Sequence, residues 1–411
     1  MTAQRETGRG RYRVGVIGAG VRAGAYFTNI PAELTGTIEL AAVADPDPAR
    51  REAFGKLFGG ESATPYETGA ELLAPEALAA SELDAVVIGT PNDQHAPDIV
   101  AAADAGLTVL AEKPVAISVA ECAALWAATE RAADRIVVGF VLRYVPFYAR
   151  VREIVAGGSL GEILAIDADE NLGTGLTRLF HRSWRASAAR SGGFMVEKCC
   201  HDFDILNWLV GTPPVRVFSM AARSHFRPRP EAEKRERFIT RDTGLELDFG
   251  ERDWTDVFVP HEENNPYDLG ADIPDHQQAI VEFAGGTLCT LTAAMAQPHT
   301  NRRLRIFGTD GALEGDLASG RIVVSSPNPA DDGWRSHEEL VTTNDSGHHG
   351  GDAVIGHAFW HTVAGVPDLS RAGVREGIAA VLVAAGAEES AATGRQVDLT
   401  AHHRQVFGPV V

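Results

Sequence analysis

The sequence has few cysteines and no apolar run long enough to cross a bilayer. Its four cysteines are Cys122, Cys199, Cys200 and Cys289, and they lack the spacing of a metal site. Two neighbouring cysteines such as Cys199 and Cys200 do not typically form a structural disulfide. We therefore expect reduced thiols in a cytoplasmic protein, with no metal. Residues 1–11 lack the apolar core of a signal peptide, and we read them as a disordered tail.

Positive charge is scarce relative to negative charge. Lys and Arg total 37 and Asp and Glu total 56, which gives a net charge of −19. This charge argues against nucleic acid or an anionic membrane as a partner. Because 411 residues exceed one compact core, we predict two domains, over residues 12–142 and 143–411.

A glycine-rich turn follows the first apolar strand, which is expected at Arg13–Ile17. The turn, Gly18-Ala19-Gly20-Val21-Arg22-Ala23-Gly24, matches the Gly-x-Gly-x-x-Ala pattern, and a helix-compatible segment follows it. Such a turn places a pyrophosphate at a helix N-terminus. We therefore expect cofactor contacts from Gly18, Gly20, Val21 and Arg22.

A second apolar strand, Ile38–Ala44, ends in Asp45. An acidic residue at this distance from the glycine turn suits the ribose diol of a dinucleotide, and its charge would repel a 2′-phosphate. The pattern favours NAD over NADP, although Arg50 and Arg51 soften that preference. A flavodoxin-like sheet without a dinucleotide is the alternative.

Strands and helices continue to alternate, as a doubly wound parallel sheet requires. Three more apolar strands are expected at Leu83–Ile88, Leu107–Ala111 and Ile136–Phe140. Ligands bind at the carboxyl ends of such strands. We therefore predict cofactor contacts from the residues that follow them: Thr90, Pro91, Asn92, His95, Glu112, Lys113 and Arg143.

One segment of the predicted second domain indicates a proton-transfer site. After Gly192-Gly193, a helix is expected over about Phe194–Val210, and in it Glu197 and His201 are four residues apart on one face. A carboxylate one turn from an imidazole can orient a base that works near neutral pH. A structural pair that anchors the helix is the alternative.

Later segments predict a half-buried sheet and a long loop. Residues 279–292 and 303–315 each read as a hairpin, and residues 225–275 read as a loop-rich insertion or as exposed decoration. In Gly347-His348-His349-Gly350-Gly351-Asp352, Asp352 is a candidate helix cap, and His349 either faces the substrate or lies at the surface. A late helix is expected over Val374–Ser390.

Cations gather around the expected catalytic helix although the chain is acidic overall. They include Arg178, His181, Arg182, Arg185 and Lys198. Such groups can hold a carboxylate, sulfonate or phosphate, or can pair with nearby acids. An anionic substrate is therefore one hypothesis.

The chain resembles the Gfo/Idh/MocA oxidoreductases, the family of glucose–fructose oxidoreductase and inositol dehydrogenase. The matching stretches are Gly18–Gly24, Gly89–His95, Glu112-Lys113-Pro114 and Gly192–Gly211. The resemblance implies an α/β fold, with a Rossmann dinucleotide-binding domain followed by an α+β domain that has a large open, mostly antiparallel sheet. It also implies a homodimer or homotetramer formed through the outer face of that sheet.

The resemblance also implies roles for individual residues. Lys113 would contact substrate and nicotinamide, His201 would be the catalytic histidine, and Asp204 would be the later helical aspartate at the substrate. Glu197 stands at the usual aspartate position and Cys199 at the usual glycine. These departures suggest a subgroup with its own pocket geometry.

Three functions follow from this reading. The first is NAD-dependent oxidation of a secondary hydroxyl on a sugar, sugar acid or cyclitol, with His201 as base, Glu197 orienting it and Lys113 polarising the oxygen. The second is glycoside hydrolysis by oxidation, elimination, hydration and re-reduction, with NAD recycled. The third is a non-catalytic NAD-binding regulator, which is disfavoured because such relatives typically lack the lysine.

Overall fold

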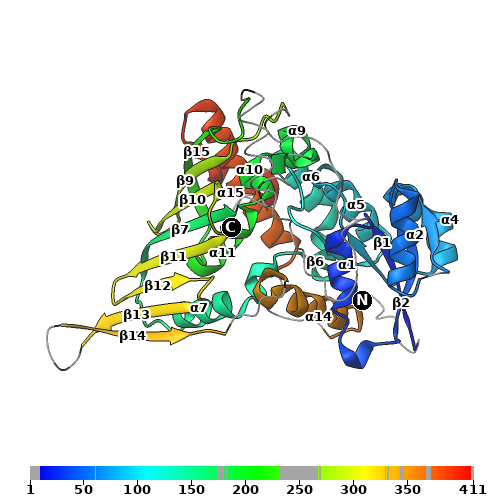
Figure 1. The fold of residues 1–411 in the computed structure, drawn as a ribbon, viewed down its shortest axis with the longest axis horizontal. Coiled ribbons are helices and arrows are strands. Elements are labelled where there is room, and N and C mark those ends of the chain that lie inside the picture. Colours follow the sequence, from blue (N-terminus) through cyan, green and yellow to red (C-terminus); the bar gives the residue numbers. More distant parts are fainter. Residues whose placement is uncertain are drawn as a thin grey trace.

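The computed structural model describes residues 10–60, 62–173, 177, 180–181, 183–228, 230, 267, 270–328, 330, 333–342, 347–366 and 372–408. The described chain forms two sheets with helices between them (Figure 1). Most of the expected insertion at 225–275 lies outside the described residues, as do Arg178 and Arg182. Within the described part, no helix is long and apolar enough to span a membrane.

The first sheet has six parallel strands in the order β3-β2-β1-β4-β5-β6. Its strands are β1 (Tyr12–Ile17), β2 (Ile38–Ala44), β3 (Thr64–Tyr66), β4 (Ala85–Ile88), β5 (Thr108–Ala111) and β6 (Ile136–Val138). Its helices are α1 (Val21–Thr28), α2 (Pro48–Leu57), α3 (Gly69–Leu72), α4 (Pro75–Ser81), α5 (Asn92–Asp104) and α6 (Val119–Thr129). This strand order is that of a Rossmann fold, and it confirms the expected doubly wound sheet.

The second sheet has nine strands in the order β14-β13-β12-β11-β7-β10-β9-β8-β15. They are β7 (Ile163–Gly173), β8 (Pro214–Ala222), β9 (His276–Phe283), β10 (Leu288–Gln297), β11 (Asn301–Gly308), β12 (Ala312–Asp316), β13 (Arg321–Pro327), β14 (Trp334–Leu340) and β15 (Val397–Asp398). All neighbours pair antiparallel except β7 and β10, which run parallel. Both expected hairpins are confirmed as β9–β10 and β11–β12.

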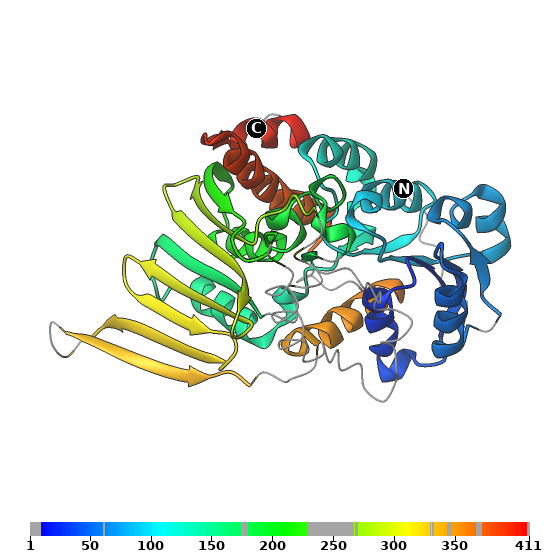
Figure 2. The same cartoon turned by 45° about the horizontal axis from the view of Figure 1, so that its top comes forward.

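The helices that follow the first sheet along the chain pack in part on the second sheet and in part on the first part of the chain. They are α7 (Pro146–Ala156), α9 (Ala188–Ser191), α10 (Phe194–Glu197), α11 (Cys200–Val210), α14 (Gly351–Val363), α15 (Val374–Thr393) and α16 (Leu399–Phe407). Helix α15, which confirms the expected late helix, packs on β8 and α11, while α14 packs against α1 (Figure 2). The predicted domain boundary at 142/143 falls in the short helix η3 (Val141–Tyr144).

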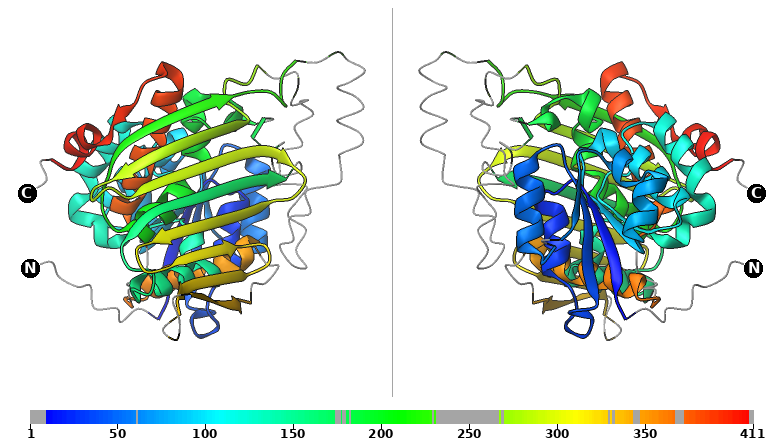
Figure 3. Two further views of the ribbon diagram at one scale, coloured as in Figure 1. Left: turned by 90° about the vertical axis from the view of Figure 1, so that its left-hand side faces the viewer. Right: turned by 90° about the vertical axis from the view of Figure 1, so that its right-hand side faces the viewer.

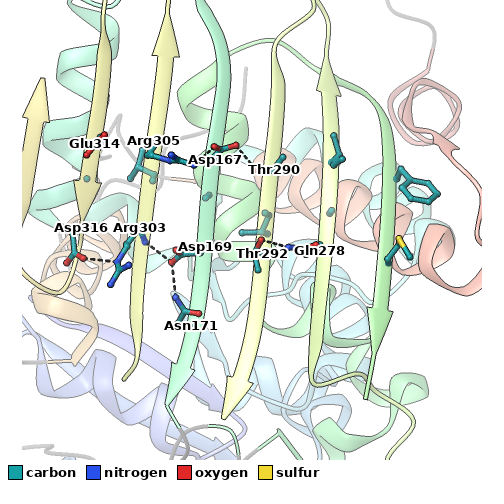
Figure 4. Close-up of a pocket in the computed structure, with 18 of the residues that line it drawn as sticks. Asp167, Asp169, Asn171, Gln278, Thr290, Thr292, Arg303, Arg305, Glu314 and Asp316 are labelled. Carbon is teal, nitrogen blue, oxygen red and sulfur yellow. Dashed lines mark hydrogen bonds and ion pairs between the residues drawn. The ribbon is translucent and has the colours of Figure 1, made fainter. Parts of the chain in front are cut away.

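The outer face of the second sheet is covered by no described helix (Figure 3). Side chains alternate across it as a half-buried sheet requires, so that the outward positions of β7 to β12 are exposed or half-buried. A shallow hollow of about 830 Å³ lies on this face, lined by polar and apolar side chains from β7 to β13 (Figure 4). The expected active-site residues Lys113, Glu197 and His201 do not line it.

Candidate active site

The glycine turn between β1 and α1 leaves the N-terminus of α1 open. Gly18 has a φ of +84°, and a Cβ there would lie 2.6 Å from the backbone of Gly89, so this position requires glycine. A Cβ at Gly20, the N-cap of α1, would meet nothing within 4 Å. Because the first turn of α1 also carries no acidic side chain, this helix end fits an anionic pyrophosphate.

Asp45 follows β2 beside that turn. Its carboxylate accepts hydrogen bonds from the backbone N–H of Ala19 (3.0 Å) and of Asp47 (2.9 Å). A carboxylate has about four acceptor positions, so two remain for the hydroxyls of a ribose. Burial raises the pKa of Asp45 above its usual value. Together with the open end of α1, this residue fits the adenosine half of NAD.

The side chains that follow β4 are bonded within the protein. Thr90 donates a hydrogen bond to Asp98 (3.1 Å), and the amide of Asn92 donates to Glu197 (2.9 Å) and to the carbonyl oxygen of Ser191 (2.9 Å). Pro91 is the N-cap residue of α5. Asn92 therefore connects the end of the first sheet to α10 and α11, the two helices that carry Glu197 and His201 and are together called the catalytic segment.

His95 was expected to contact the cofactor, and the structure corrects this. It lies on the buried face of α5, and both ring nitrogens lie within hydrogen-bond distance of backbone carbonyl oxygens, 2.6 Å from Pro114 and 2.7 Å from Thr90. No ring nitrogen is left for a cofactor. The ring instead connects the loop after β4 to the loop after β5.

Arg22 and Glu112, also expected at the cofactor, form an ion-pair chain with a third residue. Arg22 lies 2.9 Å from a carboxylate oxygen of Glu112 and 2.9 Å from one of Asp352. Tyr26 also donates to Glu112. The chain joins the glycine turn, the loop after β5 and the start of α14, so it fixes three segments of the site relative to one another.

Lys113 connects the first sheet to the catalytic segment. It follows β5, and its ammonium donates to the carbonyl oxygen of Glu197 (2.6 Å) and lies 3.7 Å from the Glu197 carboxylate. The same carboxylate accepts from Arg185 (2.7 Å). Although burial by itself raises the pKa of Glu197, Lys113 and Arg185 hold it below its usual value. Glu197 is thus an ionised anchor for two cations.

The expected continuous helix over 194–210 is divided into two. Helix α10 ends at Glu197 and α11 begins at Cys200, with Cys199 at φ −86° and ψ 0° between them. The i, i+4 relation between Glu197 and His201 is therefore broken. The expectation that Glu197 orients His201 is wrong, because the Glu197 carboxylate binds Asn92 and Arg185 instead.

His201 lies at the start of α11 and is only 3% exposed. Its ring contacts Phe140 edge-on at 5.8 Å between centroids, and its Nδ1 is buried with no hydrogen-bond partner among the described residues. Burial, followed by the charge of Lys113, lowers the pKa of His201 well below its usual value. The ring is therefore neutral at pH 7, the form in which it accepts a proton.

Lys198, expected at the substrate, belongs to a buried ionic cluster on the inner face of the second sheet. Its ammonium lies 3.4 Å from Glu170, and Arg302 pairs with both Glu170 and Asp202. Burial raises the pKa of Glu170 to about 7. Lys198 and Arg185 thus already face carboxylates, which removes two of the cations that suggested an anionic substrate.

Arg143 and Asp204 were expected at the cofactor and at the substrate, respectively. The structure joins them to each other, because the Asp204 carboxylate accepts two hydrogen bonds of 2.7 Å from the Arg143 guanidinium. Asp204 is almost fully buried. This bidentate pair holds α11 against η3.

Of the remaining expected substrate residues, the structure describes His181 and His349. His181 is buried and stacks on Phe226, with neither ring nitrogen bonded to a described residue. The histidine that lies near His201 is His348, at 6.2 Å between ring centroids, where His349 had been expected to face the substrate. Asp352 does not cap α14, whose N-cap is Gly350, but contacts His348 at 3.0 Å.

Sequence reasoning missed Arg302, Glu170, Asp202, His348 and Asp352. A signal existed only for the last two, in the segment Gly347–Asp352. The other three stand in short polar runs, such as Asp169-Glu170-Asn171 and Asn301-Arg302-Arg303, and they come together only when β7, β11 and α11 are packed. Among the described residues, no group of three or more His, Cys, Asp or Glu is arranged to hold a metal ion.

Two family models match the chain. Residues 12–140 match an oxidoreductase family with an NAD-binding Rossmann fold, and residues 148–314 match the GFO/IDH/MocA C-terminal domain. Residues 12–140 are thus an NAD-binding Rossmann domain, and NAD is its cofactor. The open end of α1 and Asp45 fit that assignment.

Known proteins with similar sequences or structures agree with these matches. YteT of Bacillus subtilis is 25% identical over 347 residues, 77% of this chain and 81% of that protein. An inositol 2-dehydrogenase of Corynebacterium glutamicum is 31% identical over 209 residues, which span 50% of this chain and only 56% of that enzyme. A levoglucosan dehydrogenase in complex with NADH shares the fold, with a TM-score of 0.72, 19% identity and coverage of 95% of this chain and 99% of that one.

Proposed function

Because the chain belongs to the Gfo/Idh/MocA family of oxidoreductases, we propose that it oxidises a secondary hydroxyl of a sugar or cyclitol with NAD, or catalyses the reverse reduction. The main support for the proposal is the hydrogen bond between Lys113 and Glu197 of the catalytic segment. Lys113 stands at the carboxyl end of β5, where a Rossmann sheet binds its ligand, and its ammonium is bonded to Glu197. His201 lies near enough for the Lys113 charge to lower its pKa.

Each residue then has a defined role. Lys113 donates a hydrogen bond to the reacting oxygen and stabilises negative charge on it. His201, neutral at pH 7, accepts the hydroxyl proton. Glu197 holds Lys113 and Arg185 in place, and Asn92 fixes Glu197. When bound at the end of α1 and Asp45, NAD would supply the acceptor for the hydride of the carbinol carbon.

The charges around the site favour a neutral substrate over an anionic one. The described cations close to the catalytic segment each face a carboxylate: Lys113 and Arg185 face Glu197, Lys198 faces Glu170, and Arg302 faces Glu170 and Asp202. A substrate carboxylate would compete with these acids. Neutral polyols, in contrast, can use the remaining lone pairs and N–H groups of the same residues.

The test is an assay with NAD and a panel of neutral sugars, cyclitols, sugar acids and aryl glycosides. Absorbance at the NADH band and release of the aglycone are followed together. We expect NADH to accumulate with a neutral polyol. Aglycone release without net NADH would favour the oxidoreductive glycosidase instead, and no response in either channel would contradict an enzymatic role on these substrates.

Variants test the assigned roles. K113M and H201N should each lower kcat by a factor of about 100 or more, because polarisation or proton transfer is lost. K56M is the matched control, since Lys56 lies on the exposed surface of α2, in an ion pair with Glu52. Unchanged kcat in H201N would exclude His201 as the base.

A pair of glycine variants tests the cofactor site without turnover. G20A adds a methyl group into open space and should keep the fold while weakening NAD binding at the end of α1. G18A places a Cβ against the backbone of Gly89 and should destabilise the domain itself. Calorimetric titration with NAD and thermal unfolding separate the two effects. Full NAD affinity in G20A would contradict this placement of the pyrophosphate.

We also infer that two copies associate through the outer face of the second sheet. Five large apolar side chains point outward there: Phe218, Met220, Ile280, Leu288 and Phe307. Phe218, Met220 and Ile280 line the hollow of Figure 4 together with its polar side chains. Exposed apolar side chains gathered on one face mark an interaction site, and we assign a second copy of this chain as its partner.

A further inference from the structure

His348 lies between the proposed base, the buried His201, and the surface of the protein. The short helix η5 (Gly347–Gly350) brings it beside His201, with ring centroids 6.2 Å apart and ring planes at 48°. His201 is 3% exposed, whereas the side chain of His348 is 34% exposed. A proton on His201 has no direct contact with bulk water, and the neighbouring imidazole does.

The ring of His348 is held in position by charged residues. Its Nδ1 lies 3.0 Å from one Asp352 oxygen, and the other Asp352 oxygen lies 2.9 Å from Arg22. Although burial by itself raises the pKa of Asp352, Arg22 and His348 hold it far below its usual value, so this carboxylate stays ionised. A carboxylate on one imidazole nitrogen fixes the tautomer and the orientation of the ring.

The backbone at His348 is strained. His348 and His349 both adopt the left-handed conformation, with φ of 49° and 54°. This conformation is strained for a residue other than glycine. Glycine stands on both sides of the pair, at Gly347 and Gly350, so the strained positions themselves are the ones that carry side chains. Such strain is characteristic of functional sites.

We propose that His348 is the proton shuttle of this site, which takes the proton from His201 and releases it to solvent. The proposal rests on the proposed oxidation. There, the substrate loses its hydroxyl proton to His201 and its C–H hydride to NAD, which leaves a ketone and a protonated His201. Before the next turnover His201 must lose that proton, and His348 lies near enough to accept it after a small ring movement or through one water.

The charges around the two rings give the transfer its direction. The groups that act on His201 are Lys113, His348, Arg302 and Lys198, and together with burial all of them lower its pKa. Burial, Arg22 and Lys198 also lower the pKa of His348, but Asp352 raises it. Of the two rings, only that of His348 has a carboxylate partner among the described residues. A proton is therefore more stable on His348 than on His201.

Chemical rescue tests the shuttle. We expect H348N to lower kcat about tenfold or more in dilute buffer while KM stays unchanged, and added imidazole to restore the rate by replacing the missing ring. Asparagine tolerates the left-handed backbone, so this variant keeps the loop. H348G, which relieves the strain, should behave in the same way. H361N is the matched control, because His361 lies on α14 and pairs with Glu33 at the surface.

The outcomes separate this proposal from the proposed function. If the wild type turns over a substrate and H348N matches it in dilute buffer, or if imidazole fails to restore the lost rate, the shuttle is wrong and the oxidation stands. If the wild type turns over none of the panel, the proposed function fails, and the shuttle fails with it.

A measurement without cofactor or substrate tests the charge gradient directly. In imidazole NMR titrations of the ligand-free protein, His348 should titrate at higher pH than His201. D352N should lower the pKa of His348, because the stabilising carboxylate is removed. A His348 that titrates below His201, or that does not respond to D352N, would overturn the proposed direction of transfer.

Discussion

The strand pair β7–β11 carries an arginine–carboxylate ion pair on each of its two faces, one of them buried and the other exposed to solvent. On the inner face Arg302 pairs with Glu170, and their side chains are 8% and 0% exposed. Arg305, which follows Arg302 by three residues on β11, pairs with Asp167 on the outer face, where the two side chains are 58% and 37% exposed. Both are cross-strand arginine–carboxylate pairs on the same two strands.

The difference shows that burial, rather than residue type, decides what such a pair does. In a single copy of the chain, water screens the outer pair, so it contributes little to stability. The inner pair has lost its water, and each charge depends on its partner. The inner cluster also includes Lys198, next to Glu197, and Asp202, next to His201. The buried pair therefore supports the catalytic segment, and the exposed pair lies on the face that we assign to association.

Removing the inner arginine should have the largest effect. R302M leaves Glu170 and Asp202 buried with only Lys198 to compensate them, so we expect a loss of about 3–5 kcal/mol in the free energy of unfolding. Denaturant unfolding followed by circular dichroism measures it. A loss below about 1 kcal/mol would mean that water reaches the cluster.

A second prediction concerns a buried group that lacks a described partner. Burial lowers the pKa of His181 to about 4, so the unfolded chain takes up a proton first as the pH falls through about 6.5. This difference should cost the wild type about 2 kcal/mol of stability between pH 8 and pH 5. H181F, which can still stack on Phe226, should lose less over that range. Equal pH profiles of the two proteins, from urea unfolding, would show that His181 is not buried as a neutral ring.

Removing the outer arginine should have a much smaller effect. R305M breaks an exposed pair with Asp167, and we expect a loss of about 0–1 kcal/mol that shrinks in high salt. It is the matched counterpart of R302M, because the strand and the residue change are the same. If the two variants were equally destabilised, the contrast between the faces would be wrong.

The smallest effect on folding is expected at the apolar part of the outer face. Met220 is 69% exposed on β8, so M220K should change the free energy of unfolding by less than about 0.5 kcal/mol. It should, however, weaken association, because it places a charge within an apolar interface. Light scattering at several concentrations measures the mass. A wild type that is monomeric throughout, or an M220K protein of unchanged mass, would refute this interface.

Local features of the site could be predicted from the sequence. The glycine turn, the strand that ends in Asp45 and the position of Lys113 after β5 depend on short-range rules for turns and buried strands. Both predicted hairpins and the late helix were also correct. In these segments the residues that determine the structure are neighbours in the chain.

Predictions that depended on long-range partners were less successful. The assumption of one continuous helix placed Glu197 on His201, but the chain breaks at Cys199 and the carboxylate binds Asn92 and Arg185. His95 was expected to face the cofactor and is held by two carbonyl groups. For each of these side chains, the bonding partner comes from another segment, which a pattern along the chain does not specify.

The sequence by itself thus determined a dinucleotide turn, the order of strands and helices, and two of the groups that could act on a substrate, Lys113 and His201. Tertiary structure decided how charges pair. It placed Glu170 opposite Arg302, Asp352 between Arg22 and His348, and His348 beside His201. The physical reason is that backbone preferences act over a few residues, whereas the strength of an ion pair or the basicity of a histidine depends on the solvent and charges that packing brings around it.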